Sequence, residues 1–153
     1  MEEGIRVLVG TSEGGETVRM GADLTPTKKI DQVAEDCVLT YLREHPLCSL
    51  LISEEAGKVT MDGGRGTIFL DPVDWTFIAV AGIPFYAVSI AYSEGGYTQK
   101  AVVRNLASGE TFMAADDGDR DRERDALDDA GPHVRRQQDR LQLDQEALRR
   151  QIE

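Results

Sequence analysis

The sequence predicts an α+β domain in which a packed helix precedes a mostly antiparallel sheet. Apolar residues recur with three-four spacing from about Thr27 to Glu44, which indicates a helix with one wide buried face. Downstream, short runs rich in β-branched and aromatic residues alternate with glycine-containing turns, as expected of successive hairpins. A helix followed by hairpins favours this fold class.

The helix has recognisable start and stop signals. Thr25-Pro26-Thr27 offers cap residues and a proline suited to a first helical turn. His45-Pro46 ends the helix, because the residue before a proline disfavours helical backbone angles. Before the helix, residues 5–9 fit either a strand or the end of a helix, and residues 13–16 indicate a glycine-rich turn.

Six strand-like segments follow the helix, each bounded by turn residues. The segment Thr67-Ile68-Phe69-Leu70 is apolar throughout, which is typical of a buried strand, and Pro72 predicts a turn after it because proline cannot continue a central ladder. The strands are expected at 49–53, 58–61, 67–70, 86–92, 98–104 and 110–113, with hairpin turns at 62–64, 93–96 and 105–109.

The composition of the chain changes near residue 115. All aromatic and lysine residues precede this point, whereas the remaining segment is rich in arginine and acidic residues. Asp116 to Arg124 is a charge run, and a helix is expected after Gly131-Pro132. We therefore expect a globular domain at 1–115 and a charged, low-complexity, helical tail at 116–153.

The net charge of −11 disfavours nucleic acid as a partner, because phosphate backbones require a basic surface. The longest apolar run, residues 78–91, is too short to span a bilayer and contains Gly82 and Pro84, so no membrane partner is expected. The N-terminus lacks the pattern of a signal peptide, and two cysteines form no disulfide framework. These features predict a cytoplasmic protein.

Acidic residues follow two of the predicted strands. Asp71 and Asp74 flank a corner that also contains the Val73 carbonyl, and Glu54-Glu55 ends an earlier strand. If the two strands are neighbours, three carboxylates meet and favour magnesium, manganese or calcium. Taken separately, the first motif also fits a polar turn and the second a solvated strand end.

Residues 17–115 resemble the inositol monophosphatase family, most closely its archaeal branch that also acts on fructose 1,6-bisphosphate. The resemblance implies the N-terminal half of a layered αβαβα sugar-phosphatase sandwich. It rests on five ordered motifs: Gly21-Ala22-Asp23, Thr25-Pro26-Thr27-Lys28-Lys29-Ile30-Asp31, Ser53-Glu54-Glu55, Asp71-Pro72-Val73-Asp74, and Gly82-Ile83-Pro84-Phe85-Tyr86-Ala87-Val88-Ser89-Ile90.

The resemblance also implies a metal site that holds Mg²⁺ or Mn²⁺. Glu55, Asp71 and the Val73 carbonyl would bind a first ion, and Asp71 and Asp74 would share a second. The implied reaction is two-metal hydrolysis of a sugar phosphate monoester, either inositol 1-phosphate or fructose 1,6-bisphosphate.

Further roles follow from the same resemblance. Glu55 and Thr76 would orient the attacking water, and Asp31 would act through a metal-bound water. Asp74, Trp75 and Thr76 would contact the substrate phosphate. The implied catalytic residues are therefore Glu55, Thr76 and Asp31.

The chain departs from the family pattern at three motif positions. Trp75 and Leu24 replace glycines, and Ile78 replaces an asparagine; the indole of Trp75 is expected to crowd the phosphate. The family's C-terminal half is also expected to be missing, which predicts exposed apolar surface and a homodimer formed through it. The alternative to an enzyme is a catalytically inactive metal- or phosphate-binding remnant, or an association module.

Overall fold

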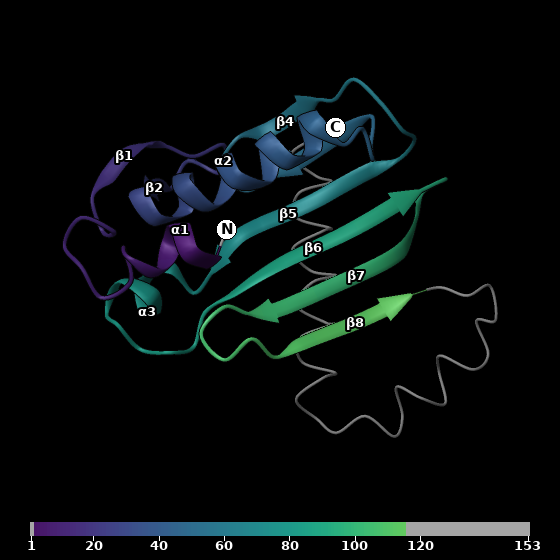
Figure 1. Cartoon of the computed structure of the whole chain (residues 1–153). Coiled ribbons are helices and arrows are strands. Elements are labelled where there is room, and N and C mark those ends of the chain that lie inside the picture. The colour runs from purple at the N-terminus through teal and green to yellow at the C-terminus, as the bar shows by residue number, and fades with distance from the viewer. Residues whose placement is uncertain (1, 116–153) are drawn as a thin grey trace. The chain divides into compact units, whose positions relative to one another are not determined.

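The longest helix of the computed structural model, α2, packs across the β4–β3–β5 side of a six-stranded sheet (Figure 1). The structure describes residues 2–115, so the tail expected at 116–153 lies outside the described residues. The elements are α1 (Glu2–Arg6), β1 (Thr17–Met20), β2 (Pro26–Lys28), α2 (Lys29–Glu44), β3 (Leu50–Ser53), β4 (Gly57–Thr60), β5 (Thr67–Asp74), α3 (Thr76–Val80), β6 (Ala87–Glu94), β7 (Tyr97–Asn105) and β8 (Thr111–Ala115).

The main sheet has the strand order β4-β3-β5-β6-β7-β8, while β1 and β2 form a separate two-stranded ribbon. All pairs in the main sheet are antiparallel except β3 with β5, which run parallel. The predicted α+β class with a mostly antiparallel sheet is therefore confirmed. The hairpin expected at residues 62–64 is wrong: that turn joins β4 to β5, but β3 lies between these two strands.

The start of α2 differs from the expected one. Pro26 and Thr27 belong to β2, where they pair with β1, so the helix begins two residues later than predicted, at Lys29. The carboxylate of Asp31 accepts a hydrogen bond of 3.0 Å from the backbone nitrogen of Lys28 and so caps the helix. The predicted end of the helix at His45 is confirmed, where the His45 nitrogen donates to the Tyr41 carbonyl.

One face of the main sheet packs on α2 and forms the core. Alternation along β3 and β5 brings Leu51, Ile68 and Leu70 to the same face, where they join Ile30 and Ala34 of the helix. All five are buried. Burying a large aliphatic side chain contributes about 1.5–3 kcal/mol, so this layer holds the helix in place.

The ladder of β5 is interrupted where the sequence predicts a turn. β5 pairs with β6 from Thr67 to Asp71, and again at Asp74, with an irregularity at Pro72 and Val73. The chain therefore bulges and continues as a strand, rather than turning at Pro72. A bulge re-aims side chains locally, and here it lies between two acidic residues of the predicted metal site.

Leu24 and Trp75 are the two non-glycine residues of the described chain with positive φ, at 69° and 68°. Both are positions at which the family resemblance expects glycine. A side chain with a Cβ atom costs about 1–2 kcal/mol in this conformation, because the Cβ crowds the following carbonyl oxygen. Backbone strain is therefore stored on both sides of the predicted site.

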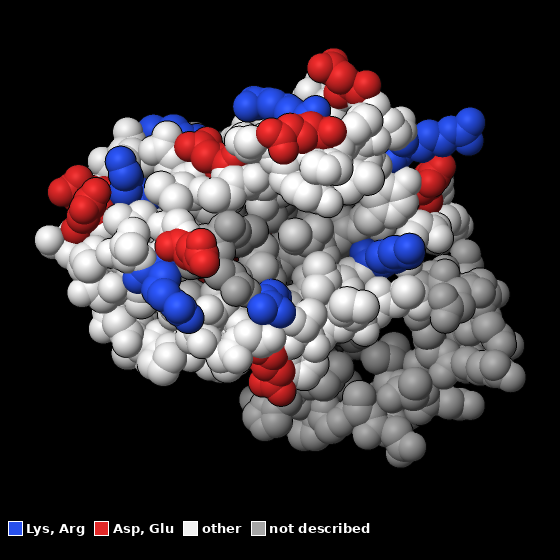
Figure 2. Space-filling model, viewed as in Figure 1, with Lys and Arg blue, Asp and Glu red and all other residues white. Residues whose placement is uncertain are grey.

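None of the helices within residues 2–115 is long and apolar enough to cross a membrane. On the described part of the face shown in Figure 2, acidic and basic side chains are interspersed. The acidic residues that concern function are instead gathered at the end of two central strands.

Replacing Leu24 by glycine is expected to raise the free energy of unfolding by about 1 kcal/mol, because glycine adopts positive φ without the Cβ clash. Leu24 is 81% exposed, so little packing is lost. Urea denaturation measures the change. Leu24→Ala is the matched control, because alanine keeps the Cβ atom; an equal gain in this variant would attribute the effect to the removed apolar side chain instead.

Candidate active site

The parallel pairing of β3 with β5 brings Glu54 beside Asp71. Ser53 and Leu70 are partners in this ladder, and Glu54 and Asp71 are the next residues of the two strands. The backbone nitrogen of Glu54 donates to the Leu70 carbonyl at 3.1 Å, which extends the pairing. The carboxyl groups of Glu54 and Asp71 share a hydrogen bond. Two acids from neighbouring strands therefore meet, whereas three are expected from the sequence.

Burial and mutual repulsion raise the pKa values of this pair. The pKa of Asp71 rises to about 9, first through burial and then through the charges of Glu54 and Asp74. The pKa of Glu54 rises to about 7, again first through burial and then through neighbouring carboxylates. Near neutral pH, the pair therefore retains a proton that isolated carboxylates would release.

One oxygen of this pair has no hydrogen-bond partner within the described chain. Asp71 Oδ1 is buried and accepts nothing from residues 2–115. A buried acceptor without a donor is costly, and carboxylates with a neighbouring backbone carbonyl suit a hard divalent cation. The residues present therefore fit the implied magnesium or manganese ion. In residues 2–115, however, no three Asp, Glu, His or Cys side chains converge closely enough to form a ready-made metal centre.

Glu55, the residue expected to bind metal, points to a different partner. Its Oε2 accepts a hydrogen bond from the Thr27 hydroxyl, and burial raises the pKa of its carboxyl group. Its assignment as a metal ligand stays a prediction, whereas Glu54 is the acid that contacts Asp71. Sequence reasoning could have found Glu54 by counting from the strand ends, since Glu54 and Asp71 each follow the last pair of the ladder.

Thr76 and Asp31 come together from opposite elements. The Thr76 hydroxyl, at the start of α3, lies 2.7 Å from Asp31 Oδ1 and 2.8 Å from the Val73 carbonyl oxygen. Asp31 is 3% exposed, and burial is the main cause that raises the pKa of its carboxyl group. A single hydroxyl group thus joins Asp31 to Val73 and Thr76, which lie more than 40 residues further along the chain.

In the sequence, Asp74 and Trp75 stand between Val73 and Thr76. Trp75 precedes the first residue of α3, as the resemblance implies, and its ring is 47% exposed. The ring packs edge-on against Phe85, with centroids 6.2 Å apart and an angle of 64° between the planes. Asp74 ends β5, and its charge contributes to the raised pKa of Asp71. The predicted contacts of both residues with a phosphate stay predictions.

A cleft of about 440 Å³ opens over the acidic residues. Asp31, Glu54 and Thr76 all contribute to its walls, so two of the acids and the hydroxyl group face one space. The residues that line it are Gly15, Thr25, Pro26, Lys28, Asp31, Glu54, Glu55, Thr76, Phe77 and Val80.

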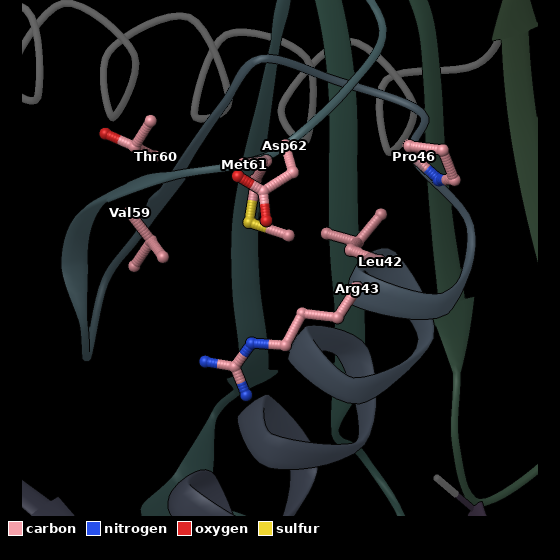
Figure 3. Close-up of a pocket in the computed structure, with 7 residues that line it drawn as sticks. All are labelled: Leu42, Arg43, Pro46, Val59, Thr60, Met61 and Asp62. Carbon is pink, nitrogen blue, oxygen red and sulfur yellow. The ribbon is translucent and has the colours of Figure 1, made fainter.

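A smaller cavity of about 130 Å³ lies at the other end of α2 (Figure 3). Leu42 and Met61 line it together with one basic residue, Arg43, and one acidic residue, Asp62. It contains neither a group of acids nor a hydroxyl paired with a carboxylate. The larger cleft is therefore the candidate active site.

The sequence profile of the inositol monophosphatase family matches residues 8–145. The chain belongs to the inositol monophosphatase family. The predicted resemblance is thereby confirmed. The match also continues past residue 115, at which we expect a domain boundary; that boundary stays a prediction.

Two curated proteins illustrate the similarity. The fructose-1,6-bisphosphatase/inositol-1-monophosphatase of Methanothermobacter thermautotrophicus is 39% identical over 127 residues, covering 74% of this chain and 45% of that protein. The bifunctional NADP phosphatase/NAD kinase of Methanococcus maripaludis is 34% identical over 133 residues, covering 74% of this chain and 23% of that protein. The chain therefore spans less than half the length of these relatives.

A solved structure supports the fold of this inositol monophosphatase family member. A Pyrococcus horikoshii protein, described as having similarities for inositol-1 monophosphatase, superposes with a TM-score of 0.61 and 26% identity. The superposition covers 76% of this chain and 44% of that protein. The fold class implied by the resemblance is confirmed, with the described elements forming one part of the longer fold.

The stability of the metal-free chain is expected to fall as the pH rises from about 5 to 8. Folding raises the pKa of Asp71 from 3.8 to about 9 and that of Glu54 from 4.5 to about 7. Between these limits, the folded chain binds more protons than the unfolded chain, so each step up in pH favours unfolding. Thermal denaturation in chelator-treated buffer measures this dependence.

Asp71→Asn should flatten this pH profile and raise the melting temperature at pH 8 by roughly 5 °C, because the amide removes the buried charge. Asp62→Asn, at an exposed aspartate, is the control and should keep the slope of the unsubstituted chain. A slope in Asp71→Asn equal to that of the control would contradict the raised pKa.

Proposed function

We propose that this chain is a magnesium-dependent phosphatase domain that hydrolyses a sugar phosphate monoester. The observation that carries the proposal is the buried, unpartnered Asp71 Oδ1 beside Glu54, at the bottom of the family's acidic motif. A site that brings several carboxylates together in a buried place is stabilised either by a retained proton or by a bound cation, and a cation would replace the proton that the pair retains. The relatives named above are phosphatases, which supports the reaction class.

Glu54, Asp71, Asp74 and the Val73 carbonyl would hold the cation. These groups offer only oxygen atoms, which favours Mg²⁺ or Mn²⁺ over softer metals. Metal dependence is general in this family, which supports the assignment. When bound, the metal would neutralise phosphate charge and lower the pKa of a coordinated water, as in the proposed two-metal mechanism.

In the proposed reaction, Thr76 and Asp31 would handle the proton of the attacking water. When the Thr76 hydroxyl donates to Asp31 across 2.7 Å, its lone pairs remain available to accept a hydrogen bond from water. Burial raises the pKa of Asp31, which makes this carboxylate a stronger proton acceptor than an exposed aspartate. The hydroxyl orients the water, and the carboxylate receives its proton.

The residues that line the cleft offer one positive charge and apolar contacts to a sugar phosphate. Lys28 lies on its wall and supplies a positive charge near the acids, while Phe77 and Val80 supply apolar contacts. Inositol 1-phosphate and fructose 1,6-bisphosphate are the proposed substrates, in line with the name of the Methanothermobacter relative. The NADP phosphatase relative extends the substrate class to a phosphate on a ribose.

A second candidate function is an inactive metal- or phosphate-binding remnant that associates with a second copy. Among the exposed large apolar side chains of the described chain, one group belongs to α3 and the segments that flank it, and another lies on the edge strand β8. Exposed apolar patches of this kind mark association surfaces. The side chains are Trp75, Phe77, Ile83 and Phe85 in the first group, and Phe112 and Met113 in the second.

Phosphate release from inositol 1-phosphate or fructose 1,6-bisphosphate is expected to require Mg²⁺ and to stop with a chelator. Asp71→Asn should lower turnover by about 100-fold or more, since metal stabilisation of the transition state is worth several kcal/mol. Asp62→Asn is the control. Trp75→Gly should raise turnover, because glycine removes both the indole and the positive-φ strain.

The two candidate functions give opposite results in this assay. Turnover that disappears in Asp71→Asn supports the enzyme. Tight Mg²⁺ binding by calorimetry without any turnover, in the unsubstituted chain and in Trp75→Gly alike, supports the remnant and contradicts the enzyme.

Sedimentation of the full chain is expected to show a homodimer that Phe77→Ser or Met113→Glu converts to a monomer. These side chains are 82% and 79% exposed, so their replacement costs little stability in the single chain. Tyr41→Ser, on the exposed face of α2, is the control. A monomeric unsubstituted chain, or a dimer that withstands both substitutions, would contradict association through these surfaces.

A further inference from the structure

We propose that the ion pair of the partly exposed Arg19 and the buried Glu35 forms an anchor that positions Glu54 for metal binding. Neither residue lines the cleft, so they act through the chain segment between β3 and β4 rather than on the substrate. The inference rests on the proposed metal-binding function of Glu54. The hydrogen bonds of Arg19 and Glu35 lie outside the cleft, and the proposed reaction does not use them.

Glu35 places a buried carboxylate against the turn after β3. The residue is 1% exposed and projects from α2. Its Oε1 accepts hydrogen bonds from the Ser53 hydroxyl and from the Ala56 backbone nitrogen, the latter at 2.9 Å. Its Oε2 accepts from Arg19 at 2.8 Å. Both oxygens are therefore satisfied, as a buried charge requires.

Arg19 joins this carboxylate to the same turn from the opposite side. Nη2 binds Glu35, and Nη1 donates to the Glu55 carbonyl oxygen at 2.7 Å. The planar guanidinium group presents both donors at once, in a fixed geometry that a lysine cannot reproduce. The Glu55 carbonyl also accepts from the Ala22 nitrogen at 3.1 Å, which ties the turn to the segment after β1.

These contacts bracket Glu54 on both sides. Glu35 holds Ser53 before it and Ala56 after it, Arg19 holds the carbonyl of Glu55, and the Glu54 nitrogen is bonded to β5. The backbone on each side of Glu54 is therefore tied to α2, β1 and β5. The backbone around Glu54 therefore has few alternative conformations, which keeps the Glu54 carboxyl group beside Asp71.

The ion pair contributes little stability by itself. The Glu35 carboxylate loses its water contacts on burial, whereas 37% of the Arg19 side chain stays exposed, so solvent screens the attraction between the two charges. What the ion pair adds is a defined geometry. Hydrogen-bond partners that orient metal ligands from behind commonly contribute 10–100-fold to metal affinity. The location of this pair behind Glu54 matches that role.

Calorimetric titration of the full chain with Mg²⁺ tests the anchor. Glu35→Gln removes the negative charge but keeps a hydrogen-bond acceptor. Arg19→Lys keeps the positive charge but loses the two N–H donors held in one plane. Each is expected to weaken Mg²⁺ binding by about tenfold. Ile5→Val, a buried substitution in α1, is the control for stability loss; it should lower the melting temperature and leave the affinity within about twofold.

Hydrogen exchange without metal supplies a second, independent measurement. The amides of Glu54 and Ala56 should exchange faster in Arg19→Lys and Glu35→Gln than in Ile5→Val at equal melting temperature, because their turn is released. Unchanged exchange at these amides would overturn the anchor.

The outcomes separate the two proposals. If the unsubstituted chain binds Mg²⁺ and both variants bind equally well, or Ile5→Val loses as much affinity, the anchor is overturned while the metal site stands. If the unsubstituted chain binds neither Mg²⁺ nor Mn²⁺, the proposed function fails, and the positioning role fails with it.

Discussion

The parallel pairing of β3 with β5 is the constraint on which the rest of the site depends. Backbone hydrogen bonds hold Ser53 beside Leu70, so the following acids, Glu54 and Asp71, meet regardless of their mutual repulsion. Pairing in a sheet is a property of the backbone and is indifferent to side-chain charge. A fold can therefore bring together carboxylates that would separate in a flexible loop. The raised pKa values reflect the unfavourable burial and repulsion of these charges.

The layer of α2 on the sheet supplies the stability that offsets this cost. Ile30 and Ala34 are fully buried against β3 and β5, and the same helix carries Asp31 and Glu35 toward the site. Three-four spacing thus serves two purposes along one helix: apolar residues bind the sheet, and neighbouring acids reach Thr76 and the turn after β3. Strain at functional positions, as at Trp75, persists only when the surrounding structure holds it.

The described chain contains a coherent part of an inositol monophosphatase fold rather than scattered motifs. The acidic pair, the hydroxyl of Thr76 and the cleft over them are all built from residues 2–115. The alignment with the Methanothermobacter relative covers 45% of that protein, and exposed apolar side chains lie around α3 and on β8 of this chain. The proposed catalysis and the proposed association can therefore be measured separately.

The sequence by itself determined the main helix, most of the strand segments after it and the family. The helix stripe and the strand segments depend on local spacing, so they could be predicted, as could the family from its motifs. The metal site at Asp71–Asp74 stays a prediction. The separate pairing of β1 with β2 was not predicted, because a four-residue exposed strand has no strong periodic signal.

Only the tertiary structure decided which residues meet. The predicted strand ends already make Glu54 and Asp71 the next residues of their strands. The parallel pairing of β3 with β5, which skips β4 and brings these two acids together, is decided by packing. The same holds for the anchor of Arg19 and Glu35, which joins residues from two elements to a third. Spacing along the chain predicts periodic faces, but contacts between distant segments follow from packing.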